Sequence, residues 1–287
     1  MNSGPRRIVC LTEETTETLY LLGEQDRIVG ISGFTSRPKE ARLKPKVSAF
    51  TSAKIEKILE LRPDLVIGFS DLQAQIAHDL IRAGLNVVVF NQRSVEEILA
   101  TILTTARLVA AETKGLELVA DLRAGLDAIE QSARRFPRRP RVFFEEWSDP
   151  LISGIRWVDE LMEIAGGDPV FPELRDRPAA KDRILEPVVV AAANPEVVIA
   201  SWCGRKVSKA QIRAREGWDA VDAVRDNQIY EIKSTYILQP GPASLTEGVR
   251  QLHAILARAV ECEPAPGLEP TESMDSDLAS PSEGSAA

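Results

Sequence analysis

The stretch LRPDLVIGF at residues 61–69 returns in altered form as ANPEVVIAS at residues 193–201. Each copy has a proline, then an acidic residue, then a β-branched run, which is typical of a buried strand entered from a turn. A second echo pairs RIVCLTEE at residues 7–14 with RVFFEE at residues 141–146. The offsets are 132 residues between the prolines and 134 between the opening arginines. Two echoes at a nearly constant offset indicate two lobes built on one plan.

Short β-branched runs alternate with longer helical patterns in both lobes. This alternation is typical of βαβ units, so we expect an α/β fold of two Rossmann-like lobes with parallel sheets and a ligand cleft between the lobes. The expected strands are 8–11, 28–32, 65–68, 87–91, 142–145, 197–201 and 228–232. The expected helices within the lobes are 16–22, 53–61, 73–83, 158–165 and 245–259.

The longest helical pattern runs between the lobes, from Ser94 to about residue 135. Ser94 is expected to cap it, because Glu97 three residues on completes a capping box, and Pro137 ends it. Some 40 residues at about 1.5 Å each would make a rod of roughly 60 Å, which suits one helix joining both lobes. Two helices with a corner near Gly115 are the alternative. The expected parts are an N-terminal lobe (1–93), the helix (94–136), a C-terminal lobe (137–262) and a disordered acidic tail (263–287).

Charge and hydropathy exclude several classes of protein. The net charge is −8, but seven acids and no Lys or Arg follow Arg258, so residues 1–260 carry about −1. No long basic stripe with interleaved aromatic residues is present, so nucleic acid is not expected as a partner. No apolar run reaches the ~18 residues of a membrane span, and none of signal-peptide length opens the chain. We expect a cytoplasmic monomer for the sequence as written, and a periplasmic one if its N-terminus was trimmed.

Polar and aromatic side chains gather where the expected strands end. Parallel sheets bind ligands outside the carboxyl ends of their strands, so these positions predict the ligand site. Three of the four tryptophans, Trp147, Trp157 and Trp202, are expected in loops, which favours a flat or apolar ligand surface, although each ring alone could belong to the core. The candidate ligand-binding residues are Glu13, Glu14, Phe34, Phe69, Ser70, Asn91, Gln92, Glu145, Glu146, Trp147, Trp202, Cys203 and Gln239.

In each lobe a strand-like run that opens with Arg ends in a pair of adjacent glutamates, Glu13 with Glu14 and Glu145 with Glu146. Carboxylates from both lobes could hold a cation, a metal chelate, or the amide and hydroxyl groups of a ligand. Interaction with the dipole of the following helix explains Glu13 and Glu14 equally well. Both interpretations stay open at this point.

The chain offers few residues for catalysis or for a protein-bound metal. Its two histidines, His78 and His253, fall inside helical patterns, so neither a histidine-ligated metal nor a Ser-His-Asp triad is expected. Cys203 is a nucleophile, a soft metal ligand or an inert small residue. We expect no enzyme, no catalytic residue, no metal site and no cofactor. An enzyme using the glutamates or Cys203 is the least favoured alternative.

The order of these features resembles the long-helix class (class III) of periplasmic binding proteins, which capture cobalamin and ferric siderophores for ABC importers. The resemblance runs from about Arg7 to about Ala259. It implies two lobes joined by a long helix that acts as a hinge, and capture of a small molecule without chemistry. The motifs that carry it are DRIVGI at 26–31, IEKILELRPDLVI at 55–67, NPEVVI at 194–199 and AVRDNQIY at 223–230.

Similarity to the cobalamin-binding branch, through RIVCLT at 7–12 and SWCG at 201–204, implies cobalamin, another corrinoid or a related metal chelate as ligand. The resemblance also implies the membrane subunits of an ABC importer as partners. Members that dock on an importer present a glutamate in an outer loop of each lobe, whereas the corresponding stretches here, 73–75 and 153–157, contain no acid. The alternative is a cytosolic carrier or sensor of the same ligand class, or of a metal cation, that works without an importer.

Overall fold

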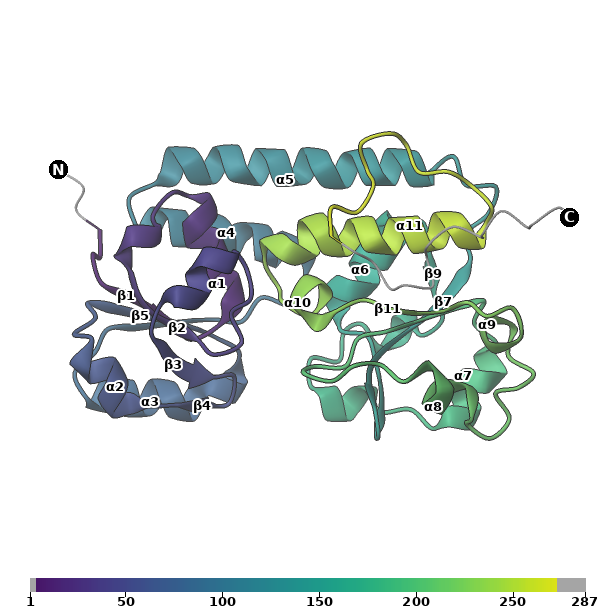
Figure 1. Cartoon of the computed structure of the whole chain (residues 1–287), viewed down its shortest axis with the longest axis horizontal. Helices are drawn as coiled ribbons and strands as arrows, with labels where there is room; N and C mark the ends of the chain where they lie inside the picture. The colour runs from purple at the N-terminus through teal and green to yellow at the C-terminus, as the bar shows by residue number, and fades with distance from the viewer. Residues whose placement is uncertain (1–3, 273–287) are drawn as a thin grey trace, which may run out of the picture. The chain divides into compact units, whose positions relative to one another are not determined.

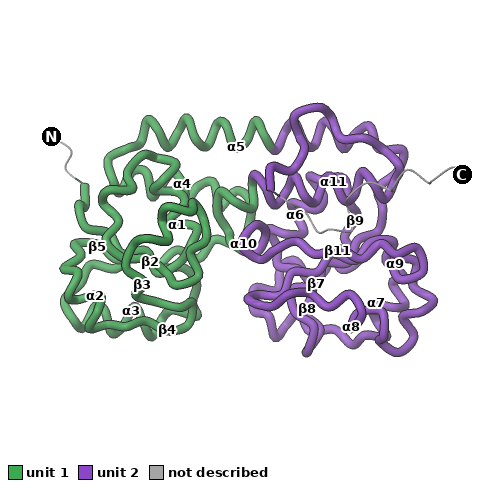
Figure 2. Tube along the Cα trace, in the orientation of Figure 1, with its two compact units in different colours: residues 1–125, 239–245 green, residues 126–238, 246–287 purple. Residues whose placement is uncertain are grey.

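The computed structural model describes residues 4–272 of the chain (Figure 1). The chain divides into two compact units, residues 1–125 with 239–245 (unit 1) and residues 126–238 with 246–287 (unit 2) (Figure 2). It therefore enters unit 2 at residue 126, returns to unit 1 for the segment 239–245, and ends in unit 2. No helix between residues 4 and 272 is both long enough and apolar enough to cross a membrane.

Unit 1 contains one six-stranded sheet. Its strands are β1 (Ile8–Cys10), β2 (Ile28–Ser32), β3 (Lys46–Ala49), β4 (Ser52–Ala53), β5 (Leu65–Phe69) and β6 (Val87–Phe90). They follow the order β4-β3-β2-β1-β5-β6, and every pair is parallel except β3 with β4. β1 is central, because Ile8 pairs with Ile28 on one side and with Leu65 on the other.

Helices cover both faces of this sheet (Figure 1). They are α1 (Glu13–Leu21), α2 (Ile55–Glu60), α3 (Ala74–Arg82) and α4 (Val95–Leu108). Successive side chains of a strand point to opposite faces, so Ile8 and Cys10 pack with α1 and α4, whereas Val9 and Leu11 pack with α2 and α3. β1 is buried on both sides, which is why its sequence is a continuous apolar run rather than an alternating one.

The expected single helix over residues 94–136 is wrong, because the pattern forms two helices, α4 and α5 (Glu112–Ala133). α5, 22 residues long, is the long helix by which the chain passes from unit 1 into unit 2. α4 begins with the expected capping box of Ser94 and Glu97. It ends in a Schellman turn: Ala110 has a φ of 56°, and the N–H groups of residues 110 and 111 donate to the carbonyls of residues 107 and 106. Gly115 is not the corner. It lies within α5, where a Cβ atom would collide with Ala106 of α4, so its missing side chain lets the two helices pack closely.

Unit 2 contains a second sheet, with strand order β11-β10-β7-β8 and with β9 pairing with β7. Its strands are β7 (Arg141–Ser148), β8 (Leu151–Ser153), β9 (Asp168–Pro169), β10 (Val197–Ala200) and β11 (Ile229–Glu231). β7, β10 and β11 are parallel, whereas β8 is antiparallel to β7. Its helices are α6 (Arg156–Ile164), α7 (Pro187–Ala193), α8 (Lys209–Arg213), α9 (Asp222–Arg225), α10 (Ser234–Ile237) and α11 (Val249–Ala259).

The first part of the expected disordered tail packs on unit 2. The backbone N–H of Ala265 donates to the Ser132 hydroxyl at 2.9 Å, and the N–H of Thr271 donates to the Glu247 carboxylate at 2.9 Å. Leu268 is buried. Residues 263–272 therefore depart from the expectation because one apolar side chain and several backbone groups find partners. The remaining residues of the expected tail lie outside the described part of the chain.

Candidate functional site

The parallel strands of unit 1 bring most of the first-lobe candidates to one edge of its sheet. β1 runs into Glu13 and Glu14 at the start of α1, and β2 runs into the loop that carries Phe34. β5 ends at Phe69, which Ser70 follows, and Asn91 and Gln92 come directly after β6. Gln239, which we expected in the second lobe, also belongs to unit 1.

Glu13 and Glu14 lie in the first turn of α1 and are poorly solvated. The Thr12 hydroxyl donates to Oε1 of Glu14 at 2.5 Å, but Oε2 of Glu14 and Oε1 of Glu13 are buried without a hydrogen-bond partner among residues 4–272. Burial raises the pKa of Glu13 to about 8, with repulsion from Glu14 and Glu17 adding to the shift. Burial likewise raises the pKa of Glu14 to about 7. Near neutral pH both carboxyl groups therefore carry protons for much of the time.

The segment 239–245 covers the first turns of α1. The side-chain amide of Gln92 donates to the carbonyl of Pro240 at 3.0 Å. Gly241 lies so close to Glu14 that a Cβ atom on the glycine would collide with the glutamate side chain. The backbone N–H of Ala243 bonds to Glu17, whose carboxylate also pairs with Arg37 at 3.0 Å. This covering segment explains why Glu14 is buried.

The aromatic candidates of unit 1 have different environments. Phe34 is 54% exposed in the loop after β2. Phe69 is buried, and the guanidinium of Arg93 lies 4.8 Å from the centre of its ring. Arg93 also donates to the hydroxyl of Ser70 at 3.1 Å. Phe69 and Ser70 are thus engaged within the protein, whereas Phe34 and the exposed Asn91 are available to a ligand.

Glu145 of unit 2 is fully buried and fully paired, so it does not project toward a ligand as the sequence suggested. Arg215 donates to both of its carboxylate oxygens, at 2.7 and 2.8 Å. The indole N–H of Trp202 donates to the same carboxylate at 3.0 Å. Glu145 therefore accepts three hydrogen bonds that tie Trp202 to Arg215. Arg215 lies 70 residues away, and nothing in the local sequence indicates the pair.

Glu146 is also paired, although part of its side chain reaches solvent. Arg183 donates to its Oε2 atom at 2.7 Å and also donates to the backbone carbonyl of Ser153. Arg183 is itself buried. Both glutamates of the second lobe thus have an arginine partner that sequence analysis missed.

Trp147 lies near the end of β7 and Trp202 follows the end of the adjacent β10, and the two rings flank one cation. Trp202 is buried in the core of unit 2, whereas Trp147 is partly exposed. The guanidinium of Arg205 lies 5.6 Å from the ring centre of Trp147 and 5.5 Å from that of Trp202. The indole N–H of Trp147 donates to the carbonyl of Asp149 at 2.9 Å, which fixes the ring. We call Trp147, Arg205 and Trp202 the tryptophan clamp. Trp157, which we expected in a loop, is instead a buried residue of α6.

The cysteines and histidines form no chemical centre in the described structure. Cys203 is exposed in the loop next to Trp202, whereas Cys10 is buried, which raises the pKa of its thiol to about 12. His78 lies on α3, and His253 lies within α11, hydrogen-bonded to Ala165 and Ser132. Between residues 4 and 272, no group of three or more His, Cys, Asp or Glu side chains is placed to hold a metal ion.

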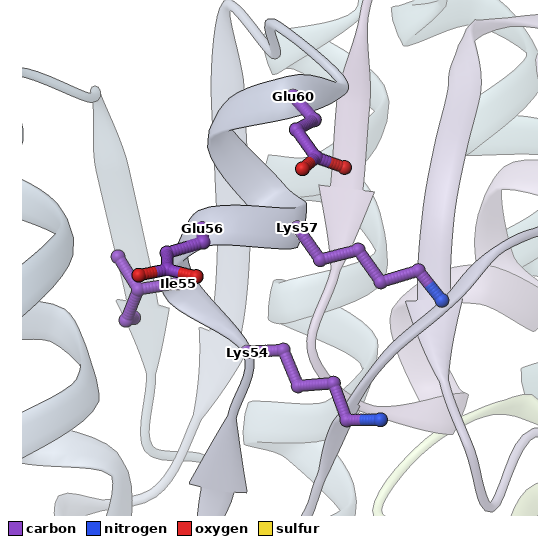
Figure 3. Close-up of a pocket in the computed structure, with 5 residues that line it drawn as sticks. All are labelled: Lys54, Ile55, Glu56, Lys57 and Glu60. Carbon is purple, nitrogen blue, oxygen red and sulfur yellow. The ribbon is translucent and has the colours of Figure 1, made fainter.

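A surface pocket of about 640 Å³ lies along α2, away from these residues (Figure 3). The amine of Lys57 donates to the carbonyl of Lys46, the first residue of β3, so the pocket lies toward the amino ends of the strands. None of the candidate ligand-binding residues lines it. Its lining residues are Lys54, Ile55, Glu56, Lys57 and Glu60.

Comparison with known proteins identifies the family. The sequence profile of the periplasmic binding protein family matches residues 8–236. The chain is 26% identical over 261 residues to the uncharacterized ABC transporter substrate-binding lipoprotein YvrC of Bacillus subtilis, covering 86% of this chain and 79% of that protein. It is 26% identical over 247 residues to the vitamin B12-binding protein of Vibrio parahaemolyticus, covering 85% of this chain and 87% of that protein.

A solved structure agrees with this assignment. The periplasmic heme-binding protein RhuT of Roseiflexus sp. RS-1, in its apo form, matches with a TM-score of 0.75 and 25% identity, over 90% of this chain and 100% of that one. The two α/β units, each with a mostly parallel sheet, also confirm the fold class expected from the sequence. Because the profile spans both units, this chain belongs to the periplasmic binding protein family.

Proposed function

We propose that this chain is a substrate-binding protein that captures a corrinoid such as cobalamin, or a related metal chelate. The similarity to a vitamin B12-binding protein and to a heme-binding protein supports a large, ring-shaped chelate as the ligand class. The observation in this chain that carries the proposal is the tryptophan clamp. The partly exposed indole ring of Trp147 offers flat apolar area to such a ligand, and it lies where parallel sheets bind ligands. Trp202 is buried in the core of unit 2 and contributes through its contact with the exposed Arg205.

Unit 1 by itself also presents groups that could contact a ligand. Phe34 offers an exposed ring, and Asn91 and the partly exposed Glu13 offer polar groups at the same sheet edge. A corrinoid carries amide groups around its rim, and these can donate hydrogen bonds to carboxyl and amide oxygens.

The role of an importer is the second question. The family assignment supports delivery to the membrane subunits of an ABC importer. The alternative, a carrier or sensor without an importer, is favoured by the stretch 73–75. Gln73 is buried, where it accepts the N–H of Phe69 at 3.0 Å and donates to the carbonyl of Phe50 at 2.8 Å, so it presents no side chain for docking. Vitamin B12 uptake by a strain that lacks its own binding protein, complemented with an exported form of this chain, separates the two.

Intrinsic fluorescence tests the ligand class directly. All four tryptophans lie in unit 2, and Trp147 and Trp202 are at its candidate site, so ligand binding there should quench the emission. We expect saturable quenching by aquocobalamin, corrected for absorption by the corrinoid. Ferric hydroxamate and simple metal salts serve as comparators. A response to bare cations alone would refute the proposal in favour of a cation-binding protein.

Matched variants locate the contact surface. Phe34→Ala should weaken binding about tenfold, equivalent to ~1.4 kcal/mol, because it removes an exposed ring from the expected surface. Leu43→Ala is the control, since Leu43 is 89% exposed in the 3₁₀ helix Lys39–Leu43 and should not touch the ligand. Equal effects of the two substitutions would exclude Phe34 from the site.

A further inference from the structure

Both rings of the tryptophan clamp are held in place by hydrogen bonds within unit 2. Trp147 donates to the carbonyl of Asp149, and Trp202 donates to Glu145, which is itself locked by two bonds from Arg215. The guanidinium of Arg205 is therefore held against rings that cannot rotate freely. The conformational entropy of these side chains is therefore lost when the protein folds, not when the ligand binds.

The charge of Arg205 is not neutralised within the described structure. Among residues 4–272 no carboxylate pairs with it, whereas the nearby arginines Arg183 and Arg215 pair with Glu146 and Glu145. Arg205 is exposed, and the exposed Lys206 follows it. Two arginines of unit 2, Arg183 and Arg215, are thus paired internally, whereas Arg205 is exposed to solvent.

Contact with an aromatic face leaves the planar edge of a guanidinium accessible. That edge carries parallel N–H donors whose spacing matches the two oxygens of a carboxylate or a phosphate. The rings exclude water from one side, which strengthens the attraction between Arg205 and an anion compared with a fully solvated arginine. A neutral amide can accept from one donor but offers no compensating charge.

We infer that the tryptophan clamp receives an oxyanion that belongs to the captured chelate, either a phosphodiester or a carboxylate, through Arg205. This inference rests on the proposed function and makes it more specific. The clamp would then select chelates that carry such a group over otherwise similar neutral ones. The partly exposed Trp147 would contact the ring system and Arg205 would bind the oxyanion, while the buried Trp202 holds Arg205 in place.

Two pairs of ligands separate the sources of the oxyanion. Cobalamin carries a phosphodiester in its nucleotide loop, and cobinamide has the same corrin ring without that loop. Hemin carries two carboxylates, and its dimethyl ester carries none. Dissociation constants for all four are measured by fluorescence titration for the wild type, Arg205→Ala, Arg205→Lys and the control Arg225→Ala. Arg225 is on α9, where it pairs with Asp222 and Asp226.

The inference predicts that Arg205→Ala weakens binding of one charged ligand about tenfold more than binding of its neutral counterpart. A selective loss for cobalamin identifies the phosphodiester, and a selective loss for hemin identifies the carboxylates. Arg205→Lys should retain part of the preference, and Arg225→Ala all of it. Equal losses for the charged and neutral members of both pairs would overturn the inference and leave the proposed function standing. Failure of the wild type to bind any of the four would refute the proposed function, and the inference with it.

Discussion

Replacing Arg215 with alanine should destabilise unit 2 by about 3–5 kcal/mol, because the substitution leaves Glu145 as an uncompensated buried charge. Glu145 has no exposed surface, and only 10% of the Arg215 side chain is exposed. The two hydrogen bonds that join them, at 2.7 and 2.8 Å, have the geometry of a bidentate pair. One bond to the carboxylate, from Trp202, would remain and cannot neutralise the charge.

Urea unfolding followed by tryptophan fluorescence measures this loss, since all four tryptophans lie in unit 2. Arg225→Ala removes only exposed ion pairs on the same unit, which water screens, so it should cost little stability. Adding Glu145→Gln to Arg215→Ala should recover part of the stability, because it removes the stranded charge. A loss from Arg215→Ala as small as that from Arg225→Ala would refute the interpretation of Glu145 as a buried charge that depends on its arginine.

Three further substitutions test other parts of the structure. Glu14→Gln should make unit 1 less sensitive to pH, because burial raises the folded pKa of Glu14 to about 7 from an ordinary 4.5. As pH rises from below 4.5 through 7, titration of Glu14 should cost the wild type on the order of 3 kcal/mol of stability. Hydrogen exchange of α1 amides, corrected for intrinsic rates, should show a smaller loss in the variant, in which Glu13 with its pKa of about 8 still titrates; an equal loss would contradict this. Gly241→Ala should lower the stability seen in the same exchange measurement by ~1–3 kcal/mol, because its Cβ would collide with Glu14. The control Gly125→Ala, in open space on α5, should be neutral or stabilising. The opposite order would mean that segment 239–245 does not pack on α1. Burial lowers the folded pKa of His253, so the wild-type unit 2 should lose stability as pH falls below about 6.5, where the histidine of the unfolded chain takes up a proton. His253→Gln should not show this loss. Identical pH profiles of tryptophan-detected unfolding for variant and wild type would contradict this.

Much of the fold was predictable, because a parallel strand that is buried on both faces appears in the sequence as a continuous apolar run. The echoed stretches at 61–69 and 193–201 contain β5 and β10, which lie next to the first strand of their sheets. The break between α4 and α5 could not be found in this way. The turning residue is Ala110, which carries no helix-breaking signal, and burial of Val109 and Ala111 in the core of unit 1 accompanies the turn. Gly115 gave a false signal because close packing, not a turn, requires it.

The positions of the candidate residues followed from the topology, but their partners did not. Residues at the end of a parallel strand pairing lie toward the carboxyl edge of the sheet, which placed Trp202 after β10 and Glu145 opposite the last residue of β10, although β7 itself continues to Ser148. The arginines that neutralise the second glutamate pair come from loops 37 and 70 residues away, and no spacing rule links them. Arg205 could have been found, since it follows the SWCG motif and was the nearest unassigned cation in the sequence.

Equilibrium dialysis of the protein against aquocobalamin tests the proposed function most directly, because the corrinoid's own absorbance counts the ligand retained. We predict one corrinoid per chain at saturation, with weaker retention by Phe34→Ala than by Leu43→Ala. Equal corrinoid concentrations on both sides of the membrane would contradict the proposal that this chain captures a corrinoid.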